Sequence, residues 1–86
     1  LVSEKKANPV RQAILDLTTE AGPGKTISAE QAARAVSDAN FQRVLKDVRA
    51  EAVRLHKAGT VLIYRKGKPV EDPDVFKGVY RLGLPA

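Results

Sequence analysis

The sequence predicts a mainly α domain with a small β-hairpin (α+β), and three observations lead to this prediction. Apolar residues recur at helical spacing in three segments, at about 9–20, 29–37 and 40–57. Capping residues or glycines mark the ends of these segments. Apolar side chains then alternate in direction over 61–66, and a long loop is expected at 67–74. A return strand is expected over 76–82, with Val79, Tyr80 and Leu82 able to pack. The order helix, short strand, helix, helix, strand, long loop, strand is that of a winged helix-turn-helix.

Local signals fix the first two helices. Asn8 can cap the free N–H groups of a helix that begins at Pro9, and the Gly-Pro-Gly sequence at 22–24 ends that helix. Ser28 and Gln31 have the spacing of a capping box, which opens the second helix. The inward side chains of the second helix are small, so another helix can pack very close to it. These side chains are Ala29, Ala32, Ala33 and Val36.

The segment Gly24-Lys25-Thr26 looks like the end of a phosphate-binding loop but lacks its other features. Such a loop has a glycine five residues before Gly24, where Thr19 stands, and it joins a strand to a helix. Here the segment joins a helix to a short extended piece at 25–27, with Ile27 expected to point inward. We therefore predict a tight turn and no phosphate loop.

The third helix, at 40–57, has an apolar face and a cationic face. The apolar face consists of Phe41, Val44, Leu45, Val48, Ala52 and Leu55. The opposite face collects Arg43, Lys46, Ala50, Arg54 and Lys57, with Val53 at its edge. A long helix after a short helix and before a hairpin is the one that helix-turn-helix proteins insert into DNA.

The net charge of +5 is unevenly distributed along the chain. Residues 1–40 hold five basic and five acidic side chains, whereas residues 41–68 hold eight basic and two acidic ones. A localised positive field indicates a polyanion as partner more strongly than a high isoelectric point does. The alternative is that the basic helix face is only a solvated surface.

These observations predict a DNA-binding protein, such as a transcriptional regulator, with duplex DNA as partner. Arg43 can instead pair with Asp47, and Arg54 with Glu51, which would be ordinary helix support. Lys46 and Lys57 have no such partner on the helix and are the better evidence. The predicted nucleic-acid-binding residues are Asn40, Gln42, Arg43, Lys46, Arg54, Lys57, Arg65, Lys66 and Lys68.

The predicted wing has two parts of opposite charge. Arg65, Lys66 and Lys68 make its rising arm cationic, whereas Glu71, Asp72 and Asp74 make its far side anionic. An acidic segment is poorly suited to the negative potential of a minor groove. We therefore expect only the rising arm to contact nucleic acid.

An enzymatic function is not expected from these residues. The chain has no cysteine and one histidine, His56, so thiolate metal sites are excluded and no metal or other cofactor is predicted. His56 is interpreted as helix surface or as a lid on the core. Glu71, Asp72 and Asp74 lie beside prolines, where a hydrophilic turn is the simpler interpretation.

We expect one winged-helix domain at 8–86, preceded by a flexible tail at 1–7. No apolar run approaches the length of about 20 residues that a membrane span needs, so a soluble, cytoplasmic protein is expected, with no small-molecule ligand evident. The chain begins at Leu1 and contains no methionine, which indicates a processed or trimmed chain, or a piece of a longer one.

The sequence leaves two other functions open. Winged helices also serve as protein-interaction modules or adaptors, and Val53, Leu15 and hairpin residues would then form the docking patch. RNA binding is the weaker option, because aromatic residues make up 5% of the chain and offer no stacking platform.

Three runs of sequence resemble a bacterial domain-of-unknown-function family of small proteins that are expected to be winged helices. The runs are 22–27, 48–55 and 65–73, and Lys-Gly-Lys-Pro-Val within the last is the most distinctive. The similarity covers almost the entire chain after the first few residues. A tryptophan is common in the family near the start of the third helix. Phe41 occupies that place in this sequence, and its aromatic ring can take the same role in the core. The resemblance implies the fold and assigns no site residues.

Overall fold

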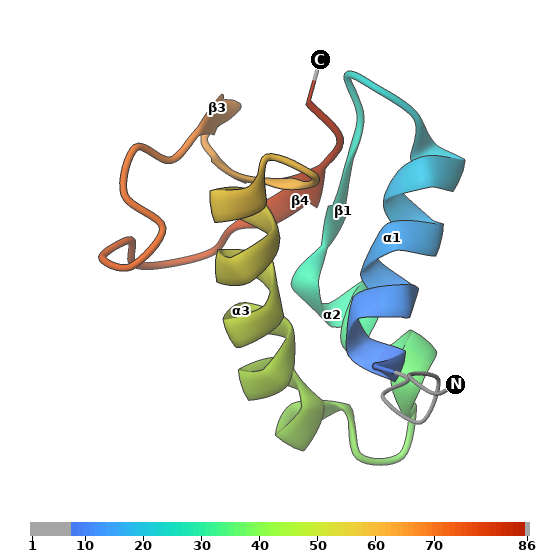
Figure 1. Ribbon diagram of the computed structural model, residues 1–86. Coiled ribbons are helices and arrows are strands. Elements are labelled where there is room, and N and C mark those ends of the chain that lie inside the picture. Colours follow the sequence, from blue (N-terminus) through green and yellow to red (C-terminus); the bar gives the residue numbers. More distant parts are fainter. Residues whose placement is uncertain (1–7, 86) are drawn as a thin grey trace, which may run out of the picture.

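A computed structural model describes residues 8–85, and the predicted tail at 1–7 lies outside them. It contains three helices and one small antiparallel sheet, which confirms the predicted fold class and is consistent with a winged-helix-like arrangement (Figure 1). Within the described residues, no helix is long and apolar enough to cross a membrane. The elements are α1 (Pro9–Ala21), β1 (Thr26–Ser28), α2 (Ala29–Val36), α3 (Phe41–Ala58), β2 (Leu62–Arg65), β3 (Lys68–Pro69) and β4 (Arg81–Gly83).

The predicted helix starts are present in atomic detail. The Asn8 side chain accepts a hydrogen bond from the backbone N–H of Arg11 at 3.0 Å, at the start of α1. The capping box of α2 forms both of its bonds, because Ser28 Oγ accepts from the Gln31 N–H at 3.0 Å and Gln31 Oε1 accepts from the Ser28 N–H at 2.9 Å. The capping residue of α3, Asn40, makes no side-chain cap bond.

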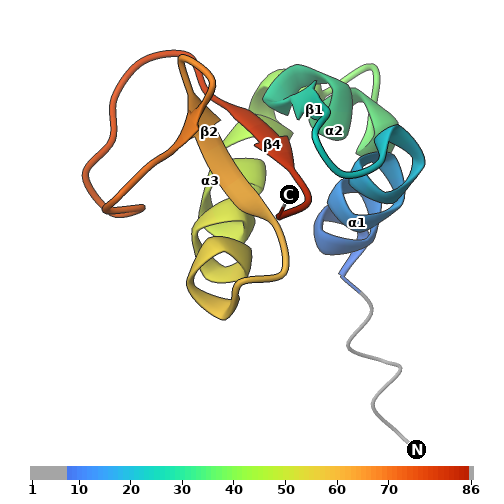
Figure 2. The same ribbon diagram turned by 90° about the horizontal axis from the view of Figure 1, so that it is seen from above.

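The sheet has the strand order β1-β4-β2-β3, so β4 pairs with strands from both halves of the chain (Figure 2). Leu82 of β4 lies directly opposite Ile27 of β1 and Ile63 of β2. All three side chains are buried, which confirms the inward direction predicted for Ile27. The apolar row that they form is the sheet's contribution to the core.

The wing differs from the prediction of one long loop at 67–74. The chain reverses after β2 through Lys66 and Gly67, with φ of 54° and 82°, and β3 pairs with β2 at once. Two successive positive φ angles form a two-residue turn whose twist matches that of the flanking strands. Lysine is uncommon in this conformation, which is why the sequence did not indicate the turn.

The predicted return strand at 76–82 was too long, because regular pairing in β4 begins only at Arg81. Phe76 turns into the core instead, where it is 7% exposed and meets the ring of Tyr80 edge-on at 5.0 Å. Val79 is 86% exposed, so the prediction that it packs was wrong. The segment between β3 and β4 is held by these aromatic contacts rather than by strand pairing.

The apolar face of α3 lies in the core in its C-terminal part. Val48, Ala52 and Leu55 are fully buried, against Ala32 and Ala33 of α2 among others. The N-terminal residues of the predicted face, Phe41, Val44 and Leu45, are only partly buried and pack at the edge of the core. Phe41 lies under the guanidinium group of Arg34, whose carbon is 3.8 Å from the ring centroid.

Candidate nucleic-acid interface

The exposed face of α3 carries most of the predicted contact residues. Asn40 precedes the helix, and Gln42, Arg43 and Lys46 follow on its first two turns, all exposed. Arg54 and Lys57 continue this face towards the C-terminal end, with side chains 63% and 56% exposed. Ala50 lies between the two groups and is exposed as well. The structure therefore places these residues at the start of α3 and along one exposed face of it.

The ion pairs on this face differ from those expected. Arg43 and Asp47 form no ion pair in the structure of residues 8–85, and Lys46 has none there either. Lys57 lacks a partner on its own helix but pairs with Asp74 of the loop after β3, at 3.0 Å. Arg43 and Lys46 are therefore the cations available to an external anion, whereas Lys57 is partly neutralised.

The loop after β3 lies beside the cationic face of α3 rather than at the far side of the wing. Pro73 and Asp74 line a hollow of about 450 Å³ together with residues of α3. The helix residues in this hollow are Lys46, Arg49, Ala50, Val53 and Arg54. The acidic segment that was predicted as the far side of the wing thus borders the central turns of α3 at Asp74, so a carboxylate competes there for the same cations.

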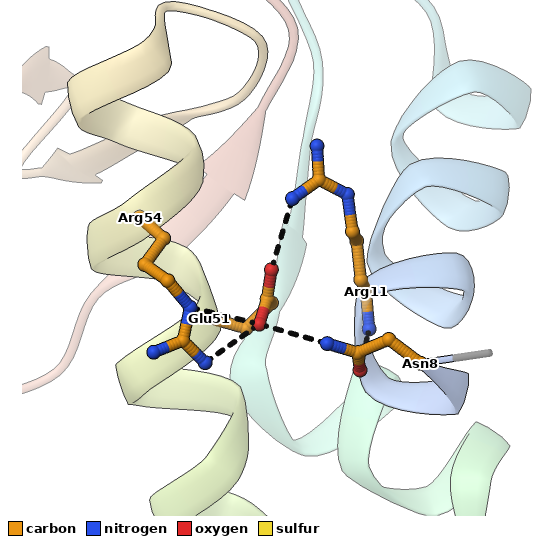
Figure 3. A network of polar contacts seen from close by, with 4 residues as sticks. All are labelled: Asn8, Arg11, Glu51 and Arg54. Atoms are coloured by element: carbon orange, nitrogen blue, oxygen red, sulfur yellow. Dashed lines mark hydrogen bonds and ion pairs between the residues drawn. The ribbon is translucent and has the colours of Figure 1, made fainter. Parts of the chain in front are cut away.

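The predicted pair of Arg54 with Glu51 is present, and it belongs to a larger network that joins α3 to the start of α1 (Figure 3). Glu51 is 2% exposed, and its Oε1 accepts from Arg54 Nη2 at 2.8 Å and from Asn8 Nδ2 at 3.0 Å. Its Oε2 accepts from Arg11 Nη1 at 3.3 Å. Each oxygen of the buried carboxylate thus accepts at least one hydrogen bond, as a buried charge requires.

The ionisation of Glu51 follows from this network. Burial alone raises the pKa of the carboxyl group, but the hydrogen bonds from Arg54 and Asn8 and the charges of Arg54 and Arg11 outweigh it. The pKa therefore lies below its ordinary value of 4.5. Spacing on α3 could have indicated the burial, because Glu51 is three residues after Val48 and four before Leu55, on the apolar side of the helix.

Arg49 was not singled out from the sequence, and the structure gives it a structural role. Its Nη2 donates to the backbone oxygen of Phe76 at 2.8 Å, and its guanidinium carbon lies 3.9 Å from the centroid of the Phe76 ring. This arginine fixes the segment between β3 and β4 against α3. The neighbouring Tyr80 phenol is largely desolvated, which raises its pKa although the charge of Arg49 opposes the rise.

The cationic residues of the wing are also divided in their roles. Lys66 and Lys68 are exposed at the β2–β3 hairpin and form no ion pair with any residue of 8–85. Arg65 is partly buried, and its Nε donates to the backbone oxygen of Val79 at 3.1 Å. The lysines are therefore open to solvent anions, while Arg65 also holds the chain before β4.

His56 is part of the scaffold. Its Nδ1 accepts a hydrogen bond from the backbone N–H of Ile63 at 3.0 Å, which ties the end of α3 to β2. Within residues 8–85, no group of three or more histidine, aspartate or glutamate residues is arranged to hold a metal ion. The half-buried position agrees with the interpretation of His56 as a lid on the core.

The fold and this face define a small α+β domain with an exposed cationic helix, which is consistent with a winged-helix-like arrangement. The chain belongs to the family described as "Protein of unknown function (DUF3253)", whose model matches residues 7–85. This finding confirms the resemblance to a domain-of-unknown-function family. A comparison with curated proteins found no match.

Proposed function

We propose that this protein binds duplex DNA, with α3 in the major groove and the β2–β3 hairpin on the phosphate backbone. The proposal rests on the start of α3, where Gln42, Arg43 and Lys46 are exposed. Arg43 and Lys46 form no ion pair with any described residue. Recognition helices contact base edges through their N-terminal residues. Guanidinium and amide groups are the side chains that read guanine and adenine there.

The other candidate residues contribute to DNA binding to different degrees in this proposal. Arg54 is oriented by Glu51 but stays 63% exposed, so its outer N–H groups can reach a phosphate. Lys66 and Lys68 contact phosphates from the hairpin, and Arg65 mainly positions the chain before β4. Five phosphate contacts, from Arg43, Lys46, Arg54, Lys66 and Lys68, correspond to a log–log salt slope of about −4.5.

Replacement of Lys46 by glutamine tests the proposal directly. We expect Lys46→Gln to weaken binding to every duplex by about tenfold, the loss typical of one hydrogen bond to a charged group. The salt slope should become shallower by about 0.9, because one phosphate contact is lost. Fluorescence anisotropy with a labelled duplex at several salt concentrations measures both quantities.

The matched control is Lys25→Gln, which removes another exposed lysine, in the turn between α1 and β1. Its affinity and salt slope should equal those of the wild type. A wild-type slope near zero, or equal slopes for wild type and Lys46→Gln, would contradict the proposal.

The ion pair between Lys57 and Asp74 predicts a substitution that should strengthen DNA binding. Asp74→Asn removes a carboxylate from the border of α3 and releases Lys57. Since an exposed ion pair is worth at most about 1 kcal/mol, DNA affinity should rise by up to about fivefold at low salt, and the gain should shrink as salt screens the charges. Asp16→Asn, on α1, is the control and should leave the affinity unchanged. An unchanged affinity of Asp74→Asn at low salt would exclude Lys57 and Asp74 from the interface.

A protein-interaction module is the second candidate, and one observation favours it. Val75 and Val79, between β3 and β4, are the exposed large apolar side chains of residues 8–85, at 68% and 86%. Leu15 and Val53, the patch expected from the sequence, are instead partly buried against the core. Charge reversal of Lys46 and Lys57 to glutamate separates the two functions, because it should abolish DNA binding and leave capture of a protein partner intact.

A further inference from the structure

The outer face of the sheet carries a second cationic surface, separate from the face of α3. A hollow of about 350 Å³ opens where β1, β4 and β2 lie side by side, and Figure 2 looks onto these strands with α2 and α3 behind them. Its volume is at the lower end of the range of about 300–1,000 Å³ typical of ligand pockets, which suits a small ligand. The lining residues are Thr26, Tyr64, Arg65, Lys66, Gly67, Val79 and Arg81.

The charges around this hollow have one sign. Arg65, Lys66 and Arg81 line it, and no carboxylate does. None of the three forms an ion pair with another residue of 8–85. Three cations that converge without a counter-charge repel each other, and a bound anion relieves that repulsion. The hollow is therefore suited to a ligand with a negative group.

Both arginines are held in place by neutral groups, which fixes their direction and leaves their charge intact. Arg81 donates from Nε to Thr26 Oγ1 at 2.7 Å and from Nη2 to the Thr26 backbone oxygen at 3.1 Å. Arg65 donates from Nε to the backbone oxygen of Val79 at 3.1 Å. The remaining N–H groups of each guanidinium are left for a ligand. Guanidinium groups that are already held in place lose little entropy on binding, and their N–H groups match the oxygens of a phosphate.

The hollow also has an apolar wall. Tyr64 lies directly opposite Arg81 in the paired strands, so both side chains stand on the same face of the sheet. The hydroxyl of Tyr64 donates to the backbone oxygen of Leu84 at 3.3 Å, which restrains the ring. Val79 lines the same hollow and is 86% exposed. A ligand with a flat apolar part would cover Val79 and lie against the tyrosine.

We propose that this hollow binds a nucleotide, with its phosphate group on Arg81, Arg65 and Lys66 and its base against Tyr64 and Val79. The ligand is either a free mononucleotide or the unpaired terminal nucleotide of a DNA strand, since both present the same phosphate and base. The site lies on the sheet and shares Lys66 with the proposed phosphate contacts of the hairpin, but it does not depend on the proposed use of α3. It became visible only in the structure, because its residues come from β1, β2, β4 and the loop before β4.

Isothermal titration calorimetry with adenosine monophosphate tests the site. Arg81→Gln should weaken the affinity by about tenfold, as the loss of a hydrogen bond to a charged group predicts. Lys66→Asn removes a charge but suits the left-handed turn before Gly67, so it should weaken binding without disturbing the hairpin. Val79→Ser should weaken adenosine monophosphate but not inorganic phosphate. Lys46→Gln on α3 is the control and should bind the nucleotide like the wild type.

Two further titrations distinguish the sources of the nucleotide. A blunt duplex and the same duplex with a one-nucleotide overhang are compared in wild type and Arg81→Gln. A preference for the overhang that disappears in Arg81→Gln indicates a strand end, and tight binding of the free nucleotide without such a preference indicates a free ligand; either result supports the site.

Two results would overturn the proposal. The first is no heat of binding with millimolar adenosine monophosphate and no preference for the overhang, with a folded protein confirmed by circular dichroism. The second is nucleotide affinity that Arg81→Gln leaves unchanged. If Arg81→Gln weakened only blunt-duplex binding, the hollow would belong to the DNA footprint and the nucleotide site would be rejected. Lys46→Gln reports on α3 alone, so failure of the DNA proposal remains separately recognisable.

Discussion

Leu82→Ala is expected to lower the free energy of unfolding by about 2–5 kcal/mol, the range for a large apolar side chain removed from a packed core. Leu82 is fully buried on the central strand β4, between Ile27 of β1 and Ile63 of β2. A domain of this size is stabilised by only about 5–10 kcal/mol, so the variant should unfold at a much lower urea concentration, or fail to fold at 37 °C. Urea denaturation followed by circular dichroism measures the change.

Val79→Ala is the matched control for Leu82→Ala. Val79 lies three residues earlier in the chain and is 86% exposed, so its truncation should change the free energy of unfolding by less than about 0.5 kcal/mol. If both variants lost similar stability, the placement of Leu82 in the core and of Val79 on the surface would be contradicted.

Glu51→Gln is the second substitution with a large expected effect. The amide keeps the size of the side chain but loses the charge that Arg54 and Arg11 neutralise, and its NH₂ group faces donors (Figure 3). Both arginines are about half exposed and can turn to water, so the loss is smaller than for a fully buried ion pair. We expect a loss of about 1–3 kcal/mol in the free energy of unfolding at pH 7.

The pH dependence provides a sharper test of Glu51. Its pKa is lower in the folded protein than in the unfolded chain, so the folded state binds fewer protons. The resulting stabilisation is complete above the unfolded pKa, near 4.5, and is lost as the pH falls through the lower folded pKa. The difference in stability between wild type and Glu51→Gln should therefore be largest at neutral pH and shrink below about pH 4.

Asp47→Asn controls for the removal of a carboxylate from the same helix. Asp47 is exposed and forms no ion pair with another residue of 8–85, so its replacement should leave stability within about 0.5 kcal/mol of the wild type at each pH. A constant difference between wild type and Glu51→Gln from pH 7 to pH 3 would contradict the lowered pKa of Glu51.

The network around Glu51 also connects stability to the proposed interface. The carboxylate holds Arg54 on α3 and Arg11 on α1 at fixed positions, so Glu51 lies between two guanidinium groups where the two helices approach each other (Figure 3). Glu51→Gln should consequently alter the direction of Arg54 as well as the stability. DNA affinity measured with this variant therefore needs comparison with Arg54→Gln at a temperature where both are folded.

The helices and the β1 segment were predicted well because their signals are local. The caps at Asn8 and Ser28, the Gly-Pro-Gly turn and the apolar periodicity act within a few residues, so the predicted bounds agree with α1, α2 and α3 to within one residue. The wing was predicted less well. The turn at Lys66 uses a conformation that its residue type disfavours, and Phe76 and Arg49 fix the following segment through contacts distant in sequence.

Helical spacing alone predicts which candidate residues lie on one face of α3, because that face does not depend on any tertiary contact. Which cations keep their charge uncompensated depends on the tertiary contacts. Lys57 meets Asp74 across 17 positions of the chain, Glu51 is buried against Asn8 and Arg11, and Arg65 and Arg81 converge on one hollow. Such pairings depend on how loops and strands fold back onto a helix, and helical spacing carries no information about that.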